Sequence, residues 1–344
     1  MTDYKNLKLK ASSSPHIRTK EDTRAIMLDV MIALLPALAF AVYNFGLRAL
    51  TVTLLSMVSC VIFEAFYRLI ARRHQTAGDL SAAVTGMLLA FACPVTVPYW
   101  LLLIGDFFAI VIVKQLYGGL GKNFLNLALA GCALLSFAGE LMTRWAAPGS
   151  RAAVWGAVEV LTCPTPMDYL HAGDLAGLQA AYSYTDVILG KISGCIGEVS
   201  ALCLLLGFLW LLFQRVILWT IPVSFVGTVA LLTFFFPQGH TPSVWMIYHI
   251  FSGSLMLGAI FMATDPVTSP ITRRGQILYG IGCGLLTVLI RCFGAHSDGV
   301  GYAILCMNLL VWLIDKSIKP HRFGVPKTAG LRTLFSGLKK EGGD

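Results

Sequence analysis

Charged residues are scarce in this chain: they make up 13% of its 344 residues, whereas a soluble domain carries roughly a quarter. Hydrophobic residues reach 56%, and the mean hydropathy is +0.73. So little charge excludes an ordinary soluble domain. It indicates that most of the chain lies in lipid, where charged side chains are costly. In lipid, each backbone polar group must be satisfied within its own element, which leaves helices or a closed barrel.

Several motifs that would indicate a catalytic or metal centre are also missing. The nine cysteines include no C-x-x-C pair and no other metal-ligand or iron–sulfur spacing. No G-x-G-x-x-G string opens a βαβ unit, so no NAD site is expected. The first 25 residues lack the apolar core of a cleavable signal peptide. We therefore expect no metal and no catalytic residue in this chain, which would act as one part of a larger assembly.

Long apolar runs are present instead. Val216–Phe236 is apolar all round and about as long as the roughly 20 residues that a spanning helix needs. The strands of a barrel would alternate apolar and polar residues, and this run does not. We therefore expect an all-α integral membrane protein with about ten transmembrane helices, at 26–46, 49–70, 79–95, 98–117, 124–142, 196–213, 216–236, 244–263, 275–293 and 301–315.

The placement of the positive charges orients these helices. With the amino terminus inside, only five of the 26 Lys and Arg residues fall outside, and the other 21 fall inside. This is a strong positive-inside signal. It explains the net charge of +8 without a nucleic-acid partner and predicts that both termini are cytoplasmic. The outside residues are Arg48, Arg144, Arg151, Lys191 and Arg291.

The two halves of the chain share a string. Gly86 through Pro98 and Gly258 through Pro270 both carry the Gly and the Pro-Val-Thr-x-Pro at an offset of 172, half the chain length. In the ten-helix topology the first string ends an inside-to-outside helix and the second an outside-to-inside helix. The match predicts two inverted five-helix repeats, an architecture that places sites near the midplane. Coincidence in a chain punctuated by Gly and Pro is the alternative.

The domain organisation follows from these helices. We expect cytoplasmic tails, two five-helix halves and, between the halves, an extracytoplasmic loop that is too polar to span the membrane. Loops longer than about 12–15 residues are usually functional or disordered. The basic carboxy-terminal tail is expected to contact anionic lipid. The predicted segments are 1–25, 26–142, 143–195, 196–318 and 319–344.

Three strings resemble the D subunit of the Rnf complex, an ion-translocating oxidoreductase. Lys114 through Gly121, followed by two asparagines, resembles the family's cytoplasmic turn after the fourth helix. Gly194 through Ser200 resembles the opening of the sixth helix, and Thr264 through Thr268 the turn after the eighth. The B subunit of the sodium-pumping NADH:quinone reductase is homologous but has a longer amino-terminal region. The short tail of this chain favours the D subunit.

The resemblance implies a covalent flavin in the outer loop. In the family, Asp-x-x-Ser/Thr-x-Ala-Thr followed by Pro-Leu marks a threonine esterified to the phosphate of FMN. By this match Thr165 is the acceptor, Thr162 the preceding hydroxyl, and Glu159 stands in the place of the acid. Pro164 replaces the usual Ala and is expected to keep Cys163 extended, presenting the acceptor on an exposed loop to a flavin transferase. The alternative is a turn with an unmodified threonine.

Ionisable residues at membrane depth are the candidates for an ion path. Asp106 lies in the middle of a predicted helix, whereas Glu198 and Asp265 flank helix ends. For the latter two, a helix cap is the open alternative. Glu64 and Lys114 are further ionisable residues within predicted helices.

The resemblance thus implies a flavin-bearing electron-transfer subunit of a bacterial inner-membrane complex that couples ferredoxin:NAD oxidoreduction to Na⁺ or H⁺ movement. Its expected partners are the other Rnf subunits, membrane lipid and the flavin transferase. The sequence leaves open whether a second, non-covalent flavin lies between the halves. A stand-alone transporter or channel for small solutes would have the same inverted-repeat plan. The threonine motif favours the electron-transfer subunit, because a passive channel has no use for it.

Overall fold

The structure is a computed structural model that describes residues 22–319, apart from 152, 156–161, 199, 239 and 295. Every regular element in this range is a helix. Two isolated bridges, Pro94 with Cys195 and Ala146 with Thr162, are the strand-like pairings found there. The prediction of an all-α chain is confirmed for the described residues.

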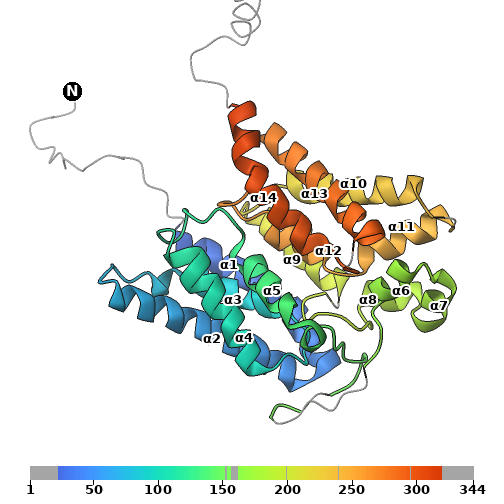
Figure 1. The fold of residues 1–344 in the computed structure, drawn as a ribbon, viewed down its shortest axis with the longest axis horizontal. Helices are drawn as coiled ribbons and strands as arrows, with labels where there is room; N and C mark the ends of the chain where they lie inside the picture. Colours follow the sequence, from blue (N-terminus) through green and yellow to red (C-terminus); the bar gives the residue numbers. More distant parts are fainter. Residues whose placement is uncertain are drawn as a thin grey trace, which may run out of the picture.

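Figure 1 shows the amino-terminal helices, blue to green, beside the carboxy-terminal ones, yellow to red. The first group comprises α1 Thr23–Phe45, α2 Leu47–Ile70, the 3₁₀ turn η2 Ala77–Asp79, α3 Ser81–Phe91, α4 Tyr99–Phe107, the π-helix η3 Phe108–Gln115, α5 Leu127–Leu135 and the 3₁₀ segment η4 Ser136–Leu141. Three short helices follow: α6 Pro166–Ala172, α7 Leu175–Ala181 and α8 Tyr184–Leu189. The last group comprises α9 Ala201–Phe213, α10 Thr220–Phe235, α11 Pro242–Phe251, α12 Leu255–Leu257, the π-helix η5 Gly258–Met262, α13 Arg273–Phe293 and α14 Val300–Ser317.

Four of these helices, α1, α2, α13 and α14, are long and apolar enough to cross a membrane. A fifth span results if α11 and the α12–η5 segment, which meet at 62°, are counted together. The other apolar helices are shorter; α3, with 11 residues, rises only about 16 Å at 1.5 Å per residue. The structure is that of an integral membrane protein, and the count of ten spans stays a prediction.

Proline determines where two of the helices are interrupted. Pro94 and Pro98 separate α3 from α4, and Pro266 and Pro270 separate η5 from α13. A proline inside a helix removes a backbone donor and clashes with the preceding turn, so these chain reversals follow from the sequence.

The span predicted at 244–263 is bent: α11 ends at Phe251, and the α12–η5 segment continues at 62° to it. Ser254 donates its backbone N–H to the Asp298 carboxylate at 2.8 Å. This side-chain bond takes the place of a helical one, so the chain turns before α12 begins.

The interior is one large apolar cluster to which both halves contribute, with Leu34, Phe91, Phe225 and Phe261 among its members. The outer surface is also apolar: α2 exposes Leu54, Ile62 and Phe66. A chain that buries apolar side chains and exposes others of the same kind has two apolar surroundings, its own core and lipid.

The 143–195 segment has a small core of its own. Helices α6, α7 and α8 bring together Met167, Leu170, Leu178 and Val187, which pack against Trp245 of α11. Burying this cluster fixes α6 beside the membrane helices. Tyr248 of α11 adds a hydrogen bond from its hydroxyl to the Tyr182 carbonyl at 2.9 Å.

Candidate functional site

Thr165 caps the amino terminus of α6. Its hydroxyl donates to the Asp168 carboxylate at 2.8 Å, its backbone N–H donates to the same oxygen at 2.8 Å, and the Asp168 N–H donates back to the hydroxyl at 3.2 Å. This is a capping box, and Pro166 at the first helical position completes it. Thr165 is only 7% exposed. The expectation that it stands on an exposed loop is wrong, because the cap and the small core of α6–α8 draw it inward.

The residue before Thr165 is also fixed. The Pro164 carbonyl oxygen accepts hydrogen bonds from the Tyr182 hydroxyl at 3.0 Å and the Ser193 hydroxyl at 2.9 Å. Burial raises the pKa of the Tyr182 phenol above its ordinary value, so this group stays a hydrogen-bond donor at neutral pH. A proline supplies the carbonyl without needing a partner for an N–H, and it therefore fits this position.

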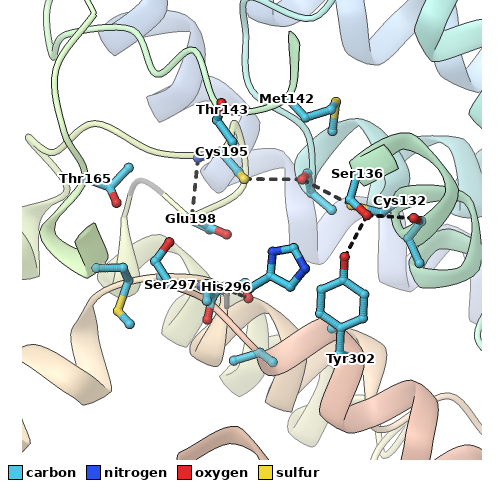
Figure 2. A pocket seen from close by; sticks show the side chains of 18 of the residues that line it. Cys132, Ser136, Met142, Thr143, Thr165, Cys195, Glu198, His296, Ser297 and Tyr302 are labelled. Atoms are coloured by element: carbon cyan, nitrogen blue, oxygen red, sulfur yellow. Dashed lines mark hydrogen bonds between the residues drawn. The ribbon is translucent and has the colours of Figure 1, made fainter. Parts of the chain in front are cut away.

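Beside Thr165 lies a cavity of about 280 Å³, shown in Figure 2. Its walls come from three parts of the chain: the α5–η4 helix of the first half, the 143–195 segment with the turn before α9, and the start of α14 with the α11–α12 turn. Among the residues that line the cavity are Cys132, Ser136, Thr165, Cys195, Glu198, Ser254, His296, Asp298 and Tyr302.

One wall combines a carboxylate with two thiols. The Glu198 carboxylate accepts the Cys195 N–H at 3.3 Å. The Cys195 and Cys132 thiols both point to the Ala92 carbonyl, at 3.3 and 3.6 Å. The predicted ion-path residue Glu198 therefore lies in the same cavity as Thr165; it closes the turn before α9, whereas Ser200 caps that helix.

Another part of the lining is aromatic. The His296 ring stacks on the Tyr302 ring, with centroids 4.9 Å apart and planes at 19°. The Tyr302 hydroxyl is 2.7 Å from the Ser136 hydroxyl, which ties α14 to α5 across the cavity (Figure 2). A flat, apolar surface of this kind suits a planar ring system.

An ion pair between a buried arginine and a partly buried aspartate supports the rim of the cavity. Arg291 contacts Asp298 at 3.0 Å and donates to the His249 carbonyl at 2.6 Å. Asp298 in turn accepts hydrogen bonds from the N–H and hydroxyl of Ser254. Arg291 was counted from the sequence as an outer-side charge; the structure gives it a second role, holding the turns that form this wall.

The remaining predicted site residues are dispersed. Thr162 lies near the acceptor in the sequence, but it is outside the cavity. Its side chain is exposed, and its backbone forms a bridge with Ala146. Glu159 lies outside the described residues. Asp265 accepts from the Val267 N–H at 3.3 Å and the Thr268 hydroxyl at 3.2 Å, as a turn cap would, and lines a second cavity of about 190 Å³. Asp106 lies between α2 and α4, away from both cavities.

Sequence reasoning missed His296, Asp298 and Tyr302. They belong to none of the motif strings and lie about 130 positions after Thr165. A histidine and an aspartate just before an apolar helix look like ordinary interfacial residues, and only the packing of α14 on α5 brings them to the cavity.

Comparison with known proteins now bears on this arrangement. The family model described as the NQR2, RnfD, RnfE family matches residues 10–324. This chain belongs to that family. The resemblance drawn from the three strings is thus confirmed, and the chain is a member of a family of membrane proteins with multiple spans.

Curated relatives of this NQR2, RnfD, RnfE family member are similar along almost their whole length. The chain is 43% identical to the D subunit of the Na⁺-translocating ferredoxin:NAD⁺ oxidoreductase complex of Acetobacterium woodii, over 93% of this chain and 97% of the relative. It is 40% identical to the D subunit of the proton-translocating ferredoxin:NAD⁺ oxidoreductase complex of Clostridium ljungdahlii, over 91% and 95%. It is also 40% identical to the D subunit of the ion-translocating oxidoreductase complex of Stutzerimonas stutzeri, over 87% and 91%.

Proposed function

We propose that this chain is the D subunit of a membrane complex that couples ferredoxin:NAD oxidoreduction to the movement of Na⁺ or H⁺. The names of relatives at 40–43% identity over most of the chain support this assignment. The chain is not catalytic alone in this proposal; it relays electrons between other subunits of the complex.

The proposal includes FMN esterified through its phosphate to Thr165. The observation that carries it is the cavity of about 280 Å³ directly beside this threonine. The residues fit the group: Thr165 supplies the hydroxyl, His296 and Tyr302 a flat wall, and Glu198 a polar edge. When bound, the flavin would take up and release electrons one at a time, while the protein sets its position and electronics.

The chain's own residues would prepare the acceptor. Asp168 holds the Thr165 hydroxyl and N–H, and Pro164 is held by Tyr182 and Ser193, so the backbone around the acceptor has one conformation. Forming the ester removes the hydroxyl hydrogen and leaves the N–H bond to Asp168. Because Thr165 is buried, the flavin transferase would have to reach it before α6–α8 pack against the membrane helices.

The test measures the flavin that stays covalently bound to the chain. Thr165→Val nearly keeps the side-chain shape but removes the oxygen, so the in-gel fluorescence of the denatured chain should disappear. Thr165→Ser should keep part of it. Thr185→Val is the matched control, since Thr185 is exposed in the same 143–195 segment and lies outside both the cavity and the motif. Mass mapping of the tryptic fragment 152–191, from protein made with a competent flavin transferase, would falsify the assignment if Thr165 were unmodified.

We further propose ten membrane crossings arranged as two inverted repeats, with both termini cytoplasmic in a bacterial inner membrane. Two proline-interrupted reversals at the offset of 172 support the repeat, and so does the overlap of α10 with the range of α2 shifted by 172. Reporter fusions after Trp145 and after Arg215 should report opposite sides, with Trp145 outside. Both on one side would refute this topology.

A second, non-covalent flavin is proposed for the cavity of about 190 Å³. Asn126, Leu211 and Asp265 line it, so both halves contribute to it. The Asn126 amide also donates to the Met262 carbonyl at 3.0 Å, across the halves. Acid precipitation of the Thr165→Val chain should release this flavin into the supernatant; a colourless supernatant would count against it.

The proposed partners are the other subunits of the complex, the flavin transferase and membrane lipid. Support for lipid comes from the apolar outer surface of helices such as α2, and from the basic residues of 319–344 in the sequence.

A further inference from the structure

The α2–α4 helix pair contains a buried polar column that the flavin site does not use. Ser56, Ser59 and Glu64 lie on the buried face of α2. Asp106 of α4 and Lys114 of η3 lie on the buried face of the helix packed against it. Placing a carboxylate at membrane depth costs free energy, so such a residue is a candidate for a functional role.

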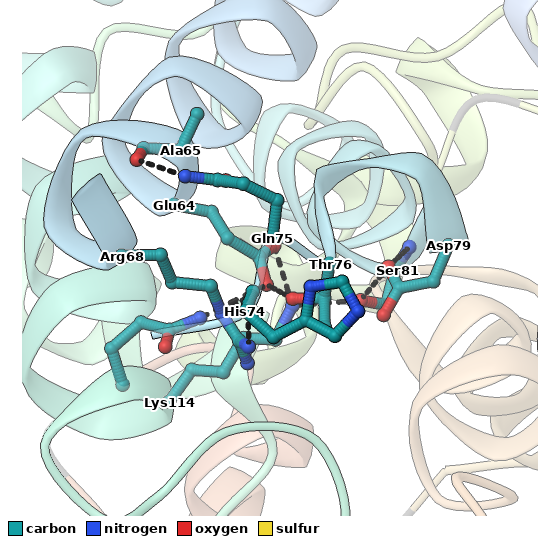
Figure 3. A network of polar contacts seen from close by, with 10 residues as sticks. Glu64, Ala65, Arg68, His74, Gln75, Thr76, Asp79, Ser81 and Lys114 are labelled. Atoms are coloured by element: carbon teal, nitrogen blue, oxygen red, sulfur yellow. Dashed lines mark hydrogen bonds and ion pairs between the residues drawn. The ribbon is translucent and has the colours of Figure 1, made fainter. Parts of the chain in front are cut away.

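At one end of the column the Glu64 carboxylate faces two cations, Lys114 and Arg68, the latter at 3.7 Å. The Lys114 ammonium is 2.8 Å from Glu64 and 2.7 Å from the Ser81 hydroxyl, and Figure 3 shows these groups with their neighbours. Glu64 also accepts from the Gln115 amide at 2.9 Å and the Thr76 hydroxyl at 2.7 Å. The π-helix η3 contributes to this arrangement, since its wider turn lets the adjacent residues Lys114 and Gln115 both face Glu64.

In the middle of the column the charge of Asp106 is not matched. It is fully buried, and its oxygens accept from the Ser56 hydroxyl at 2.6 Å, the Ser59 hydroxyl at 2.5 Å and the Cys60 thiol at 3.4 Å. Among the described residues, no Lys or Arg forms an ion pair with this carboxylate. A carboxylate buried in this way must bind a proton or a cation, because an isolated charge there costs several kcal/mol or more.

The hydroxyls of Ser56 and Ser59 each have a second acceptor besides Asp106. The Ser56 hydroxyl has one hydrogen but two acceptors in range, Asp106 and the Gly86 carbonyl at 2.8 Å. The Ser59 hydroxyl likewise faces both Asp106 and the Ser56 carbonyl at 3.0 Å. When the serines donate to these carbonyls, the two hydroxyl oxygens and the two carboxylate oxygens are left with lone pairs that a cation could share.

Gly86 makes this arrangement possible. A Cβ at this position would lie 2.4 Å from the Ser56 carbonyl oxygen, so only glycine lets α3 approach α2 closely enough. The Gly86 carbonyl then comes within reach of the Ser56 hydroxyl. The site is thus built from α2, α3 and α4.

We propose that Asp106, Ser56 and Ser59 bind one Na⁺ between α2 and α4. Carboxylate, hydroxyl and carbonyl oxygens are the ligands that hard cations take, and a proton would need only one of them. The thiols of Cys60, which contacts Asp106, and Cys93 are the neighbouring titratable groups, and Lys114 is held by Glu64. That this ion is the one translocated rests on the proposed function; its binding does not.

The experiment measures Na⁺ binding as stabilisation of the purified full-length chain. The thermal unfolding midpoint in detergent should rise with NaCl against equal choline chloride, because a ligand that binds only the folded state stabilises it. Asp106→Asn should lose this rise. Ser59→Ala should require about tenfold more Na⁺, as expected for the loss of one oxygen ligand. Thr53→Val is the matched control: it is buried on the same helix but bonds only the Ala49 carbonyl.

Three results would overturn the site: no Na⁺ dependence in the parent chain, the same dependence in Asp106→Asn, or a midpoint that follows pH but not Na⁺. Should Asp106→Asn fail to fold, the Ser59→Ala titration decides. In-gel flavin fluorescence of the same samples tests the flavin assignment independently of the Na⁺ site. A chain without flavin that still shows the Asp106-dependent rise refutes the flavin assignment and leaves the cation site standing.

Discussion

Two helix pairs of this molecule are packed in different ways. One is α2 with α4–η3 in the first half, and the other is α10 with α13 in the second. The first pair buries Glu64, Asp106 and Lys114. The second buries apolar residues of α10, such as Phe225 and Val229, against small or polar residues of α13. The halves share a proline-marked string, but their buried charges lie in different places: the first half has them between α2 and α4–η3, whereas the second has Arg291 of α13 facing α11 and Asp298.

The second pair approaches closely through glycine. A Cβ on Gly280 would lie 1.9 Å from the Ser224 hydroxyl oxygen, and one on Gly284 2.7 Å from the Thr228 Cβ. Small residues at such contacts let helices associate by close packing where no hydrophobic effect drives them together. The α10–α13 pair is thus held by close packing, whereas the α2–α4 pair accepts the cost of buried charge at the place where we propose a cation binds.

The largest loss of stability is expected when one partner of the buried Glu64–Lys114 ion pair is removed. Glu64→Gln leaves the buried Lys114 ammonium without its carboxylate and should lower the free energy of unfolding by about 3–5 kcal/mol. The double variant with Lys114→Met should recover most of that loss. Thermal unfolding of the purified chain in detergent measures both, and equal stability of single and double variants would contradict the pairing.

A smaller loss is expected from overpacking the close interface of the second half. Gly280→Leu must push α10 from α13 and should cost about 1–3 kcal/mol. Gly227→Leu, also in the second half, is the matched control, because nothing lies within 4 Å of a Cβ there. Similar melting temperatures for the two variants would show that the pair is looser than the structure indicates.

One polar contact of the second half should matter less. The Asn308 side-chain amide and the Tyr279 hydroxyl are hydrogen-bonded at 2.7 Å, with the amide N–H donating in the orientation that satisfies its neighbours, and this bond joins α13 to α14. Tyr279→Phe keeps the ring and should cost about 1 kcal/mol, the usual net value of such a bond. A loss as large as that of Glu64→Gln would mean that the second half also depends on polar contacts.

The smallest effect should be the same in both halves. Thr53 of α2 and Thr233 of α10 donate to carbonyls of their own helices, at 2.8 and 2.7 Å. Replacing either with Val should change the free energy of unfolding by about 0.6 kcal/mol or less. Unequal effects in the same unfolding assay would show that one of these hydroxyls does more than its helical contact indicates.

The sequence alone predicted the features that depend on local chemistry. Scarcity of charge implied helices in lipid, and Pro94 and Pro266 implied where two helices stop. The strings around Lys114, Glu198 and Asp265 indicated the family, because they depend on residue types at fixed spacing. The bend within the span predicted at 244–263 was not foreseen, since the break there involves Asp298, 44 positions after Ser254.

Only the tertiary structure decided what surrounds the functional side chains. Thr165 was expected on an exposed loop, but α6–α8 have a core of their own that carries it inward beside Glu198 and Tyr302. Asp106 was singled out as a mid-span carboxylate, and its contacts with Ser56 and Ser59 appeared only when α2 packed on α4. Helix type and helix ends follow from neighbours along the chain, whereas a cavity or an ion site depends on contacts between residues roughly 50 or more positions apart, which no local pattern records.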